Sequence, residues 1–392
     1  MGVFYSGRGR RESPEPGGDV VLTIDMVIQH FLERQVQWAF EKWEAESAIG
    51  IVVSPSDGKI LALANRPTFD ANRLREARTS DLVNRALTDP FAPGSTFKPI
   101  VFGAALDAGV LQATDTFDCG GGEWRFDRRL LHDVHPSGEL DVEGVLVKSS
   151  NIGAAKIGLR LGGRRLREAI QAFGFGKKTG IVLGGESSGR MTQPRNWTDT
   201  YTTVSVSFGQ EILVTPMQLA MGFSALVNGG RYHAPRIVDH WIDRDGNVET
   251  PFTPVMRRVI SSEASAEIRE MLVAVCEEGS GKPARVPGYR VGGKTGTTEK
   301  FKGKRKSGYV SSFVAFAPAQ NPRLCVLVMV NEPKGAHYGR IVAAPAVGRV
   351  LADSLAYLEV PPDPDLGDSF RSASIDTADP DAPTARDYEV AN

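Results

Sequence analysis

Three short patterns in the sequence carry residue types that suit serine acyl-transfer chemistry. They are Ser-x-x-Lys at 95–98, Ser-x-Asn at 149–151 and Lys-Thr-Gly at 294–296. A serine hydroxyl is a weak nucleophile until a neighbouring base takes its proton, and a lysine becomes such a base when burial holds it neutral. On a helix, the i, i+3 spacing brings a serine and a lysine to one face. The patterns therefore indicate a serine nucleophile with a lysine base.

The Ser-x-x-Lys pattern occurs twice, so its surroundings must separate the copies. Pro93 and Gly94 precede Ser95, and an apolar stretch follows Lys98, which predicts a turn that leads into a buried helix. A proline directly after Lys98 is tolerated if the helix begins at or just before Ser95. The second copy, 56–59, lies in a predicted exposed hairpin turn. We therefore expect Ser95 to be the nucleophile.

The Lys-Thr-Gly pattern also occurs twice, and its copies are harder to separate. Lys294 is followed by Thr295, Gly296 and Thr297, where glycine permits close approach of a substrate backbone and hydroxyls can bind a carboxylate. The other copy, 178–180, follows a Phe-Gly-Phe-Gly stretch that suits a helix end entering a loop. The pattern favours Lys294 and leaves the second copy open.

The elements around these motifs predict an α+β fold. Asp25 is a favourable N-cap for a helix of about five turns, because the apolar residues after it follow helical spacing. A helix is also predicted from about 342 to 358. Helical patterns fill much of the middle, about 95–290, including 142–161, 164–173 and 215–228. The predicted strands, which we expect to share one antiparallel sheet, are 48–53, 60–64, 309–316 and 324–330.

Composition sets the domain limits and excludes some functions. The 392 residues are 41% hydrophobic with a formal net charge of −1, so the chain can bury a sizeable core and has no general attraction for nucleic acid. Residues 1–18 suit a flexible leader, 19–360 one folded domain and 361–392 a disordered tail. Three scattered cysteines favour core positions over disulfides. No apolar run is long enough to span a membrane, so we expect the chain as given to be soluble.

Two further clusters have a functional and a structural interpretation. The sequence His132-Asp133-Val134-His135 contains metal-ligand types, but without a third helical histidine a loop of solvated polar groups is the better interpretation, and we expect no metal. The basic run 300–306 suits an exposed loop between two strands; the alternative is a contact for an anionic partner.

With their flanks, the three motifs resemble those of class B, monofunctional penicillin-binding proteins. Shorter stretches agree with the same family, and the resemblance covers about residues 19–358. The stretches that carry it are Ala92–Pro99, Val145–Gly153, Gly293–Thr297, Asn65–Asp70, Ser207–Gln210, Val214–Ala220 and Phe313–Pro318.

The resemblance implies a fold similar to penicillin-binding proteins and serine β-lactamases, with an antiparallel sheet between helices and a mostly helical subdomain. It implies a peptidoglycan D,D-transpeptidase without a cofactor, whose partners are stem peptides (a D-Ala-D-Ala donor and an amine acceptor), β-lactams, and membrane proteins of the division or elongation machinery. Such enzymes work at the extracytoplasmic face of the bacterial inner membrane. By the same resemblance, the Lys178 copy belongs to a structural segment.

The resemblance also implies a role for each motif residue. Ser95 attacks the penultimate D-Ala carbonyl, and Lys98 takes its proton. Ser149 relays a proton to the leaving D-Ala, and Asn151 holds the peptide backbone. Lys294 binds the terminal carboxylate together with Thr295 and Thr297 around Gly296. The backbone N–H groups of Ser95 and Thr297 form the oxyanion hole.

Two other classes of function stay open. A β-lactamase or D,D-carboxypeptidase passes the acyl group to water, but a glutamate with an asparagine four residues later, which β-lactamases similar to this fold often use, does not occur between Glu123 and Glu299. A penicillin-binding sensor or scaffold needs neither Ser95 nor Lys98. Departures from the family are Ala92, where relatives often carry an acid, and the sequence 337–340, where a tyrosine and glycine run is usual.

Overall fold

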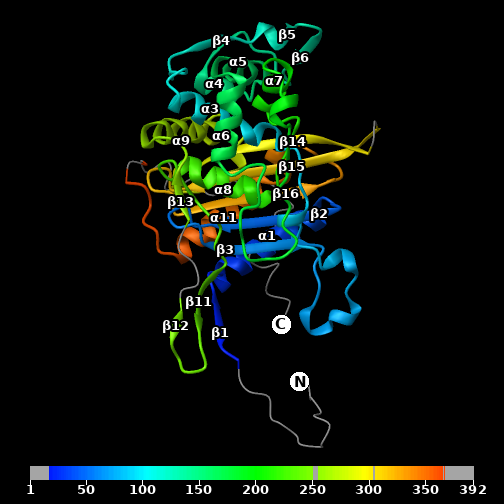
Figure 1. Ribbon diagram of the computed structural model, residues 1–392, viewed down its shortest axis with the longest axis vertical. Coiled ribbons are helices and arrows are strands. Elements are labelled where there is room, and N and C mark those ends of the chain that lie inside the picture. The colour runs from blue at the N-terminus through cyan, green and yellow to red at the C-terminus, as the bar shows by residue number, and fades with distance from the viewer. Residues whose placement is uncertain (1–16, 250–254, 303–304, 365, 367–392) are drawn as a thin grey trace, which may run out of the picture.

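A five-stranded antiparallel sheet forms the centre of the molecule (Figure 1). The computed structural model describes residues 17–249, 255–302, 305–364 and 366. In spatial order its strands are β14 (Gly292–Lys302), β15 (Arg305–Ala317), β16 (Leu324–Asn331), β2 (Ser47–Val53) and β3 (Ile60–Arg66). The sheet joins both ends of the domain. Its two strands from early in the chain, β2 and β3, meet three strands from the last third of the chain through the pairing of β2 with β16.

Helices cover both faces of this sheet, which explains its apolar central strands. β2 is buried along its whole length, and β16 is buried up to its last residue; such strands read as continuous apolar runs because both faces are covered. On one face lie α1 (Met26–Lys42) and α11 (Ala344–Tyr357), and on the other lies α8 (Pro216–Val227). The Asp25 side chain caps α1 by accepting from two backbone N–H groups, as predicted.

A mostly helical subdomain stands above the edge strand β14 (Figure 1). Helix α9 packs against both β14 and α3, and so joins the subdomain to the sheet. The helices of this region are α3 (Lys98–Asp107), α4 (Val142–Val147), α5 (Asn151–Leu161), α6 (Gly163–Ala172), α7 (Tyr201–Ser207) and α9 (Ser262–Glu277). A hairpin, β5 (Glu123–Phe126) and β6 (Arg129–His132), lies at the top of the subdomain.

The remaining elements are short. β1 (Asp19–Leu22), β11 (Val238–Ile242) and β12 (Val248–Glu249) form a separate sheet that projects away from the subdomain (Figure 1). The other strands and short helices are α2 (Arg85–Thr88), β4 (Thr116–Asp118), β7 (Glu139–Asp141), β8 (Arg190–Met191), β9 (Ile212–Leu213), β10 (Arg231–His233), β13 (Met256–Arg258) and α10 (Gly339–Val342).

The predicted α+β architecture is confirmed, with two local corrections. The helical pattern 142–161 is not one helix: α4 ends at Val147 and α5 begins at Asn151. Ser149 between them has a φ of 57°, which no helix accommodates. The basic run 300–306 is also not a plain loop, because β14 continues to Lys302 and β15 begins at Arg305.

The packed chain continues past position 360, where we expected the tail to begin. The Asp363 carboxylate accepts a hydrogen bond from the backbone N–H of Arg290 at 2.6 Å, and Leu366 is buried. Residues 1–16 and 367–392, most of the predicted leader and tail, lie outside the described residues. Within the described ranges, no helix has the length and apolar character that crossing a membrane requires.

Candidate active site

Ser95 lies in a short 3-10 helix, Gly94–Phe97, that runs directly into α3. Lys98 is the first residue of α3, so serine and lysine have the predicted i, i+3 relation. Gly94 has a φ of 56°, and a methyl group there would lie 2.5 Å from the Thr298 hydroxyl oxygen. Glycine is therefore required at this turn. Gly94 N–H also donates to the Gly209 carbonyl at 3.0 Å, which fixes the turn that presents Ser95.

The Lys98 side chain is completely buried and bound at its amine. Its Nζ donates to the Ser149 carbonyl oxygen at 2.5 Å and to Asn151 Oδ1 at 2.9 Å. Burial lowers the pKa of Lys98 well below its usual value, and the nearby Lys294 lowers it further, while Asp133 and Cys119 act in the opposite direction. The site thus favours a neutral lysine amine.

The Ser-x-Asn pattern occupies the break between α4 and α5. Ser150 caps α5 by accepting from the Gly153 N–H at 2.9 Å, and Asn151 is the first residue of that helix. Ser149 has the positive φ noted above, so its carbonyl faces Lys98 while its hydroxyl meets Lys294. The break in the helix therefore brings the Ser149 carbonyl, the Ser149 hydroxyl and Asn151 Oδ1 to the lysines.

Lys294 reaches the same serine from the edge strand β14. Its Nζ donates to Ser149 Oγ at 2.9 Å, and its side chain is fully buried. Burial lowers the pKa of Lys294 from 10.5 to about 7. Two buried lysines from segments almost 200 residues apart in sequence therefore contact one serine.

The residues after Lys294 continue β14, which is an edge strand of the sheet. Thr295 shares a hydrogen bond of 2.8 Å with the Ser280 hydroxyl, and Thr297 Oγ1 accepts from the Gly339 N–H at 3.1 Å. A methyl group on Gly296 would lie 2.9 Å from Thr96 Cγ2 and 3.0 Å from the Pro93 carbonyl. Glycine thus lets β14 lie directly against the turn that carries Ser95.

Sequence reasoning missed Ser280 and Gly339. Ser280 follows α9, and Gly339 begins α10, so both are brought to β14 only by tertiary packing. The resemblance did single out positions 337–340 as a departure from the family, and that was the available signal for Gly339.

The second copies of the motifs have structural settings. Ser56 is exposed in the β2–β3 turn, and Lys59 pairs with Asp239 at 3.1 Å. Thr179 is buried, and both its N–H and its hydroxyl donate to Glu186, which anchors a loop, while Lys178 is exposed. The structure therefore brings together only the Ser95, Ser149 and Lys294 copies.

The two alternative clusters and the cysteines also have defined surroundings. In the part of the chain that the structure describes, no group of three or more histidine, cysteine or carboxylate side chains is arranged to hold a metal ion. Lys300, in the basic run, pairs with Glu46 and Glu332. Cys119, Cys276 and Cys325 are buried and free, as predicted.

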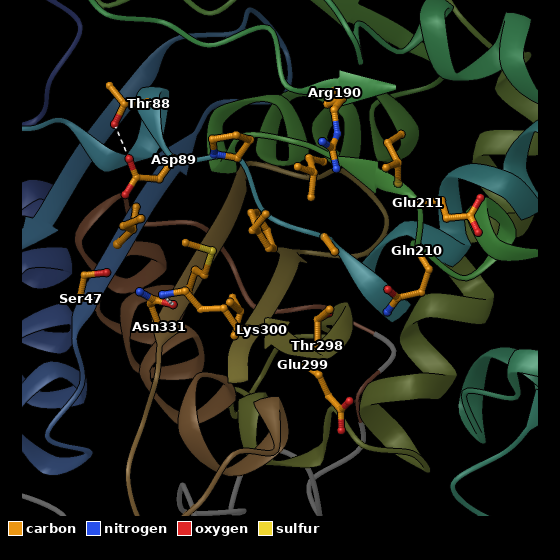
Figure 2. Close-up of a pocket in the computed structure, with 18 residues that line it drawn as sticks. Ser47, Thr88, Asp89, Arg190, Gln210, Glu211, Thr298, Glu299, Lys300 and Asn331 are labelled. Atoms are coloured by element: carbon orange, nitrogen blue, oxygen red, sulfur yellow. Dashed lines mark hydrogen bonds between the residues drawn. The ribbon is translucent and has the colours of Figure 1, made fainter. Parts of the chain in front are cut away.

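A cavity of about 650 Å³ opens beside this site (Figure 2). Its lining includes Ala92, three residues before Ser95, and Thr298, the neighbour of Thr297. Val310 and Met329 of the sheet also line it, together with Arg190 from β8. Ala92, which stands where the resemblance led us to expect an acid, contributes no carboxylate, whereas Asp89, Glu211 and Glu299 also line the cavity. The lysine pair lies outside the cavity, so the chemistry is not centred there.

Comparison with known families agrees with the fold and with the motifs. The family described as the penicillin-binding protein transpeptidase domain matches residues 48–352, which include every predicted site residue. The chain therefore belongs to the penicillin-binding protein transpeptidase family. This finding confirms the resemblance on which the expected roles rest.

Individual relatives and solved structures support the same assignment. Stage V sporulation protein D of Bacillus subtilis is 38% identical over 358 residues, covering 89% of this chain and 55% of that protein. Peptidoglycan D,D-transpeptidase FtsI of Escherichia coli is 32% identical over 348 residues, covering 88% and 57%. The chain thus spans somewhat more than half the length of these relatives.

Among solved structures, penicillin-binding protein 3 of Mycobacterium tuberculosis in complex with aztreonam has a TM-score of 0.83 at 29% identity, covering 88% of this chain and 81% of that one. The transpeptidase domain of penicillin-binding protein 3 from Burkholderia pseudomallei has a TM-score of 0.77 at 33% identity, covering 87% and 97%. These similarities confirm the predicted fold class.

Proposed function

We propose that this chain is a peptidoglycan D,D-transpeptidase that forms stem-peptide cross-links through an acyl-enzyme on Ser95 and is inhibited covalently by β-lactams. The observation that carries the proposal is the pair of buried lysines around Ser149. Keeping two amines in a buried site costs stability. A scaffold or sensor gains nothing from two buried lysines, whereas a serine nucleophile requires a neutral base beside it.

In the first half-reaction Lys98 is the general base. A neutral amine has two N–H groups, and the contacts with the Ser149 carbonyl and Asn151 use both of them. Its lone pair is then free to accept the proton of Ser95 Oγ. The oxygen attacks the penultimate D-Ala carbonyl, and the backbone N–H groups of Ser95 and Thr297 stabilise the oxyanion.

The departing D-Ala nitrogen must receive a proton when its bond to the acyl carbon breaks. Ser149 is suited to relay it, because its hydroxyl contacts Lys294 at 2.9 Å and lies 3.4 Å from Lys98 Nζ. In the second half-reaction an amine of another stem peptide attacks the ester, gives its proton back along the same path and restores Ser95. Asn151 holds the donor peptide, since its partly exposed side chain contacts Lys98 Nζ at 2.9 Å.

The donor peptide binds along β14. This strand lies at the sheet edge, so an extended peptide can pair with its free backbone groups. The terminal carboxylate then faces Lys294, Thr295 and Thr297. A bound carboxylate raises the pKa of Lys294 and keeps that amine charged, which favours a neutral Lys98.

Partners and location follow the relatives. One relative is named for sporulation and another as a transpeptidase. We include in the proposal that the chain acts at the outer face of the bacterial inner membrane with proteins of the division or elongation machinery.

The test measures transfer and hydrolysis on one sample. After labelling with a fluorescent penicillin and removal of the excess, we expect the label to persist for many minutes to hours. With a D-Ala-D-Ala-ending peptide and an excess of an amine acceptor, we expect the cross-linked product by mass spectrometry, and no product from Ser95→Ala. Label decay within seconds with steady drug turnover would indicate a β-lactamase instead. Absence of labelling would indicate a non-catalytic protein.

A further inference from the structure

We propose that Asp133 is a positioning residue for the reaction, which holds the Ser149–Asn151 turn in the geometry that the two lysines require. This inference rests on the proposed function. Asp133 was noted in the sequence only as part of a metal-like cluster. In the structure its carboxylate turns inward, not toward solvent, so the interpretation of this cluster as a loop of solvated groups is wrong for Asp133.

The carboxylate of Asp133 is fully engaged by the Ser-x-Asn segment. Oδ2 accepts from the Ser150 hydroxyl at 2.5 Å, and Oδ1 accepts from the backbone N–H of Asn151 at 2.5 Å and of Ile152 at 3.1 Å. Ser150 in turn caps Gly153. A charged acceptor at the start of a helix gives short, strong hydrogen bonds, so the first turn of α5 is fixed from outside the motif.

Fixing this turn matters because Ser149 has an unfavourable backbone. A non-glycine residue at a φ of 57° costs energy and persists only where its surroundings hold it. On its N-terminal side, Ser149 is tied to α4 by hydrogen bonds from the N–H groups of Ser149 and Ser150. On its C-terminal side, the hydrogen bonds that Asp133 accepts from residues 150–152 hold the backbone in place. Relaxation of Ser149 would move its carbonyl and its hydroxyl away from Lys98 and Lys294.

The position of Asp133 is itself fixed by the β5–β6 hairpin. Its N–H donates to the Gly122 carbonyl at 3.0 Å, and the adjacent His132 carbonyl accepts from Asn151 Nδ2 at 3.3 Å. Arg129 of the same hairpin lies over the Tyr201 ring at 4.8 Å. The hairpin thus places the Asp133 carboxylate against residues 150–152, which lie 17 to 19 positions later in the sequence. This separation hides the relation in the sequence.

Asp133 also affects the charge state of the base. Lys98 is influenced by three ionisable groups on neighbouring elements: Lys294 lowers its pKa, whereas Asp133 and Cys119 raise it. Loss of the Asp133 charge therefore lowers the pKa of Lys98 and increases its neutral fraction at a given pH. The acylation rate falls at low pH as Lys98 becomes protonated. This acid limb of the pH–rate profile must then move to lower pH. A purely structural role would reduce the rate without moving this limb.

The first test is Asp133→Asn, which has nearly the same shape. The amide oxygen can still accept from the Asn151 and Ile152 N–H groups, and the Ser150 hydroxyl can turn to accept from the amide nitrogen. The second-order rate constant of acylation by a fluorescent penicillin is measured from pH 5 to 10. We expect the midpoint of the acid limb to move to lower pH. An unmoved midpoint would overturn the effect of Asp133 on Lys98.

The second test compares Asp133→Ala with a matched control, Asp141→Ala. Asp141 caps α4 in the same subdomain by accepting from the Gly144 N–H at 2.7 Å, and lies outside the catalytic turn. We expect similar losses of thermal stability, with acylation reduced at least tenfold for Asp133→Ala only. Equal acylation in both variants would overturn the inference.

These outcomes separate the inference from the function on which it rests. If the wild-type chain is not acylated at all, the proposed function fails and the inference fails with it. If the wild-type chain is acylated but the Asp133 variants behave like Asp141→Ala, only the inference fails. If Asp133→Ala does not fold, the pH profile of Asp133→Asn decides.

Discussion

Replacement of Lys294 by methionine tests the cost of the buried amine. Methionine keeps most of the side-chain length without the charge. The pKa of Lys294 is about 7 in the folded chain and 10.5 when the lysine is exposed. This difference corresponds to about 5 kcal/mol that opposes folding wherever the lysine is charged in both states. We therefore expect Lys294→Met to increase the free energy of unfolding at pH 6 while it slows acylation at least tenfold.

The pH dependence gives the sign and a second magnitude. Above pH 10.5 the lysine is neutral in both states and carries no penalty. As pH falls from 10.5 toward 7, Lys294 is protonated in the unfolded chain but stays neutral in the folded chain. This difference stabilises the unfolded state, so the wild-type free energy of unfolding decreases. Between pH 9 and pH 6 this decrease is about 3 kcal/mol, and Lys294→Met should lack it.

The assay is equilibrium unfolding by urea at pH 6 and pH 9, for the wild-type chain and the variant. Each variant's acylation rate is measured at the same two values. Two results would refute the reasoning. One is a variant less stable than the wild type at pH 6, and the other is a stability difference that is equal at both pH values. Either would mean that Lys294 is charged and well solvated in the folded chain.

Three further predictions concern the other motif residues. Lys98→Met should slow penicillin acylation by about 10²- to 10⁴-fold, the usual contribution of a general base. A wild-type rate in this variant would show that Lys98 is not the general base. Gly296→Ala should slow acylation about tenfold or more, because the methyl group pushes β14 from the Ser95 turn and separates the oxyanion donors; an unchanged rate would contradict that contact. Lys178→Ala should leave acylation within about twofold of the wild type, as expected for an exposed surface residue, and a large loss measured by the same labelling would revive the second Lys-Thr-Gly copy.

Local sequence was sufficient to predict features that depend on near neighbours. The i, i+3 relation of Ser95 and Lys98 needs only a helix after a Pro-Gly turn, and the structure has that arrangement. The Asp25 cap and the strands β2 and β16 likewise follow from side chains close in sequence. The local pattern favoured Lys294 without excluding Lys178, and the choice between them came from resemblance.

Features that depend on distant contacts could not be predicted from periodicity. The apolar spacing from Val142 to Leu161 continues across the break at Ser149, so the pattern gave no sign of the strained residue. What stabilises that residue comes from Asp133 and from two lysines on other elements. β14 was implied only as the strand before the run 300–306, with no bounds, since its glycines, threonines and lysines lack apolar alternation. Its strand pairing comes entirely from β15.

The central claim is that Ser95 is the residue that becomes acylated. The direct measurement is the intact mass of the chain after reaction with excess penicillin, followed by proteolysis and mass spectrometry of the modified peptide. We expect one adduct per chain, located on Ser95, and none in Ser95→Ala, with Ser56→Ala labelled as fully as the wild type. An adduct on any other residue, or one that persists in Ser95→Ala, would contradict the account.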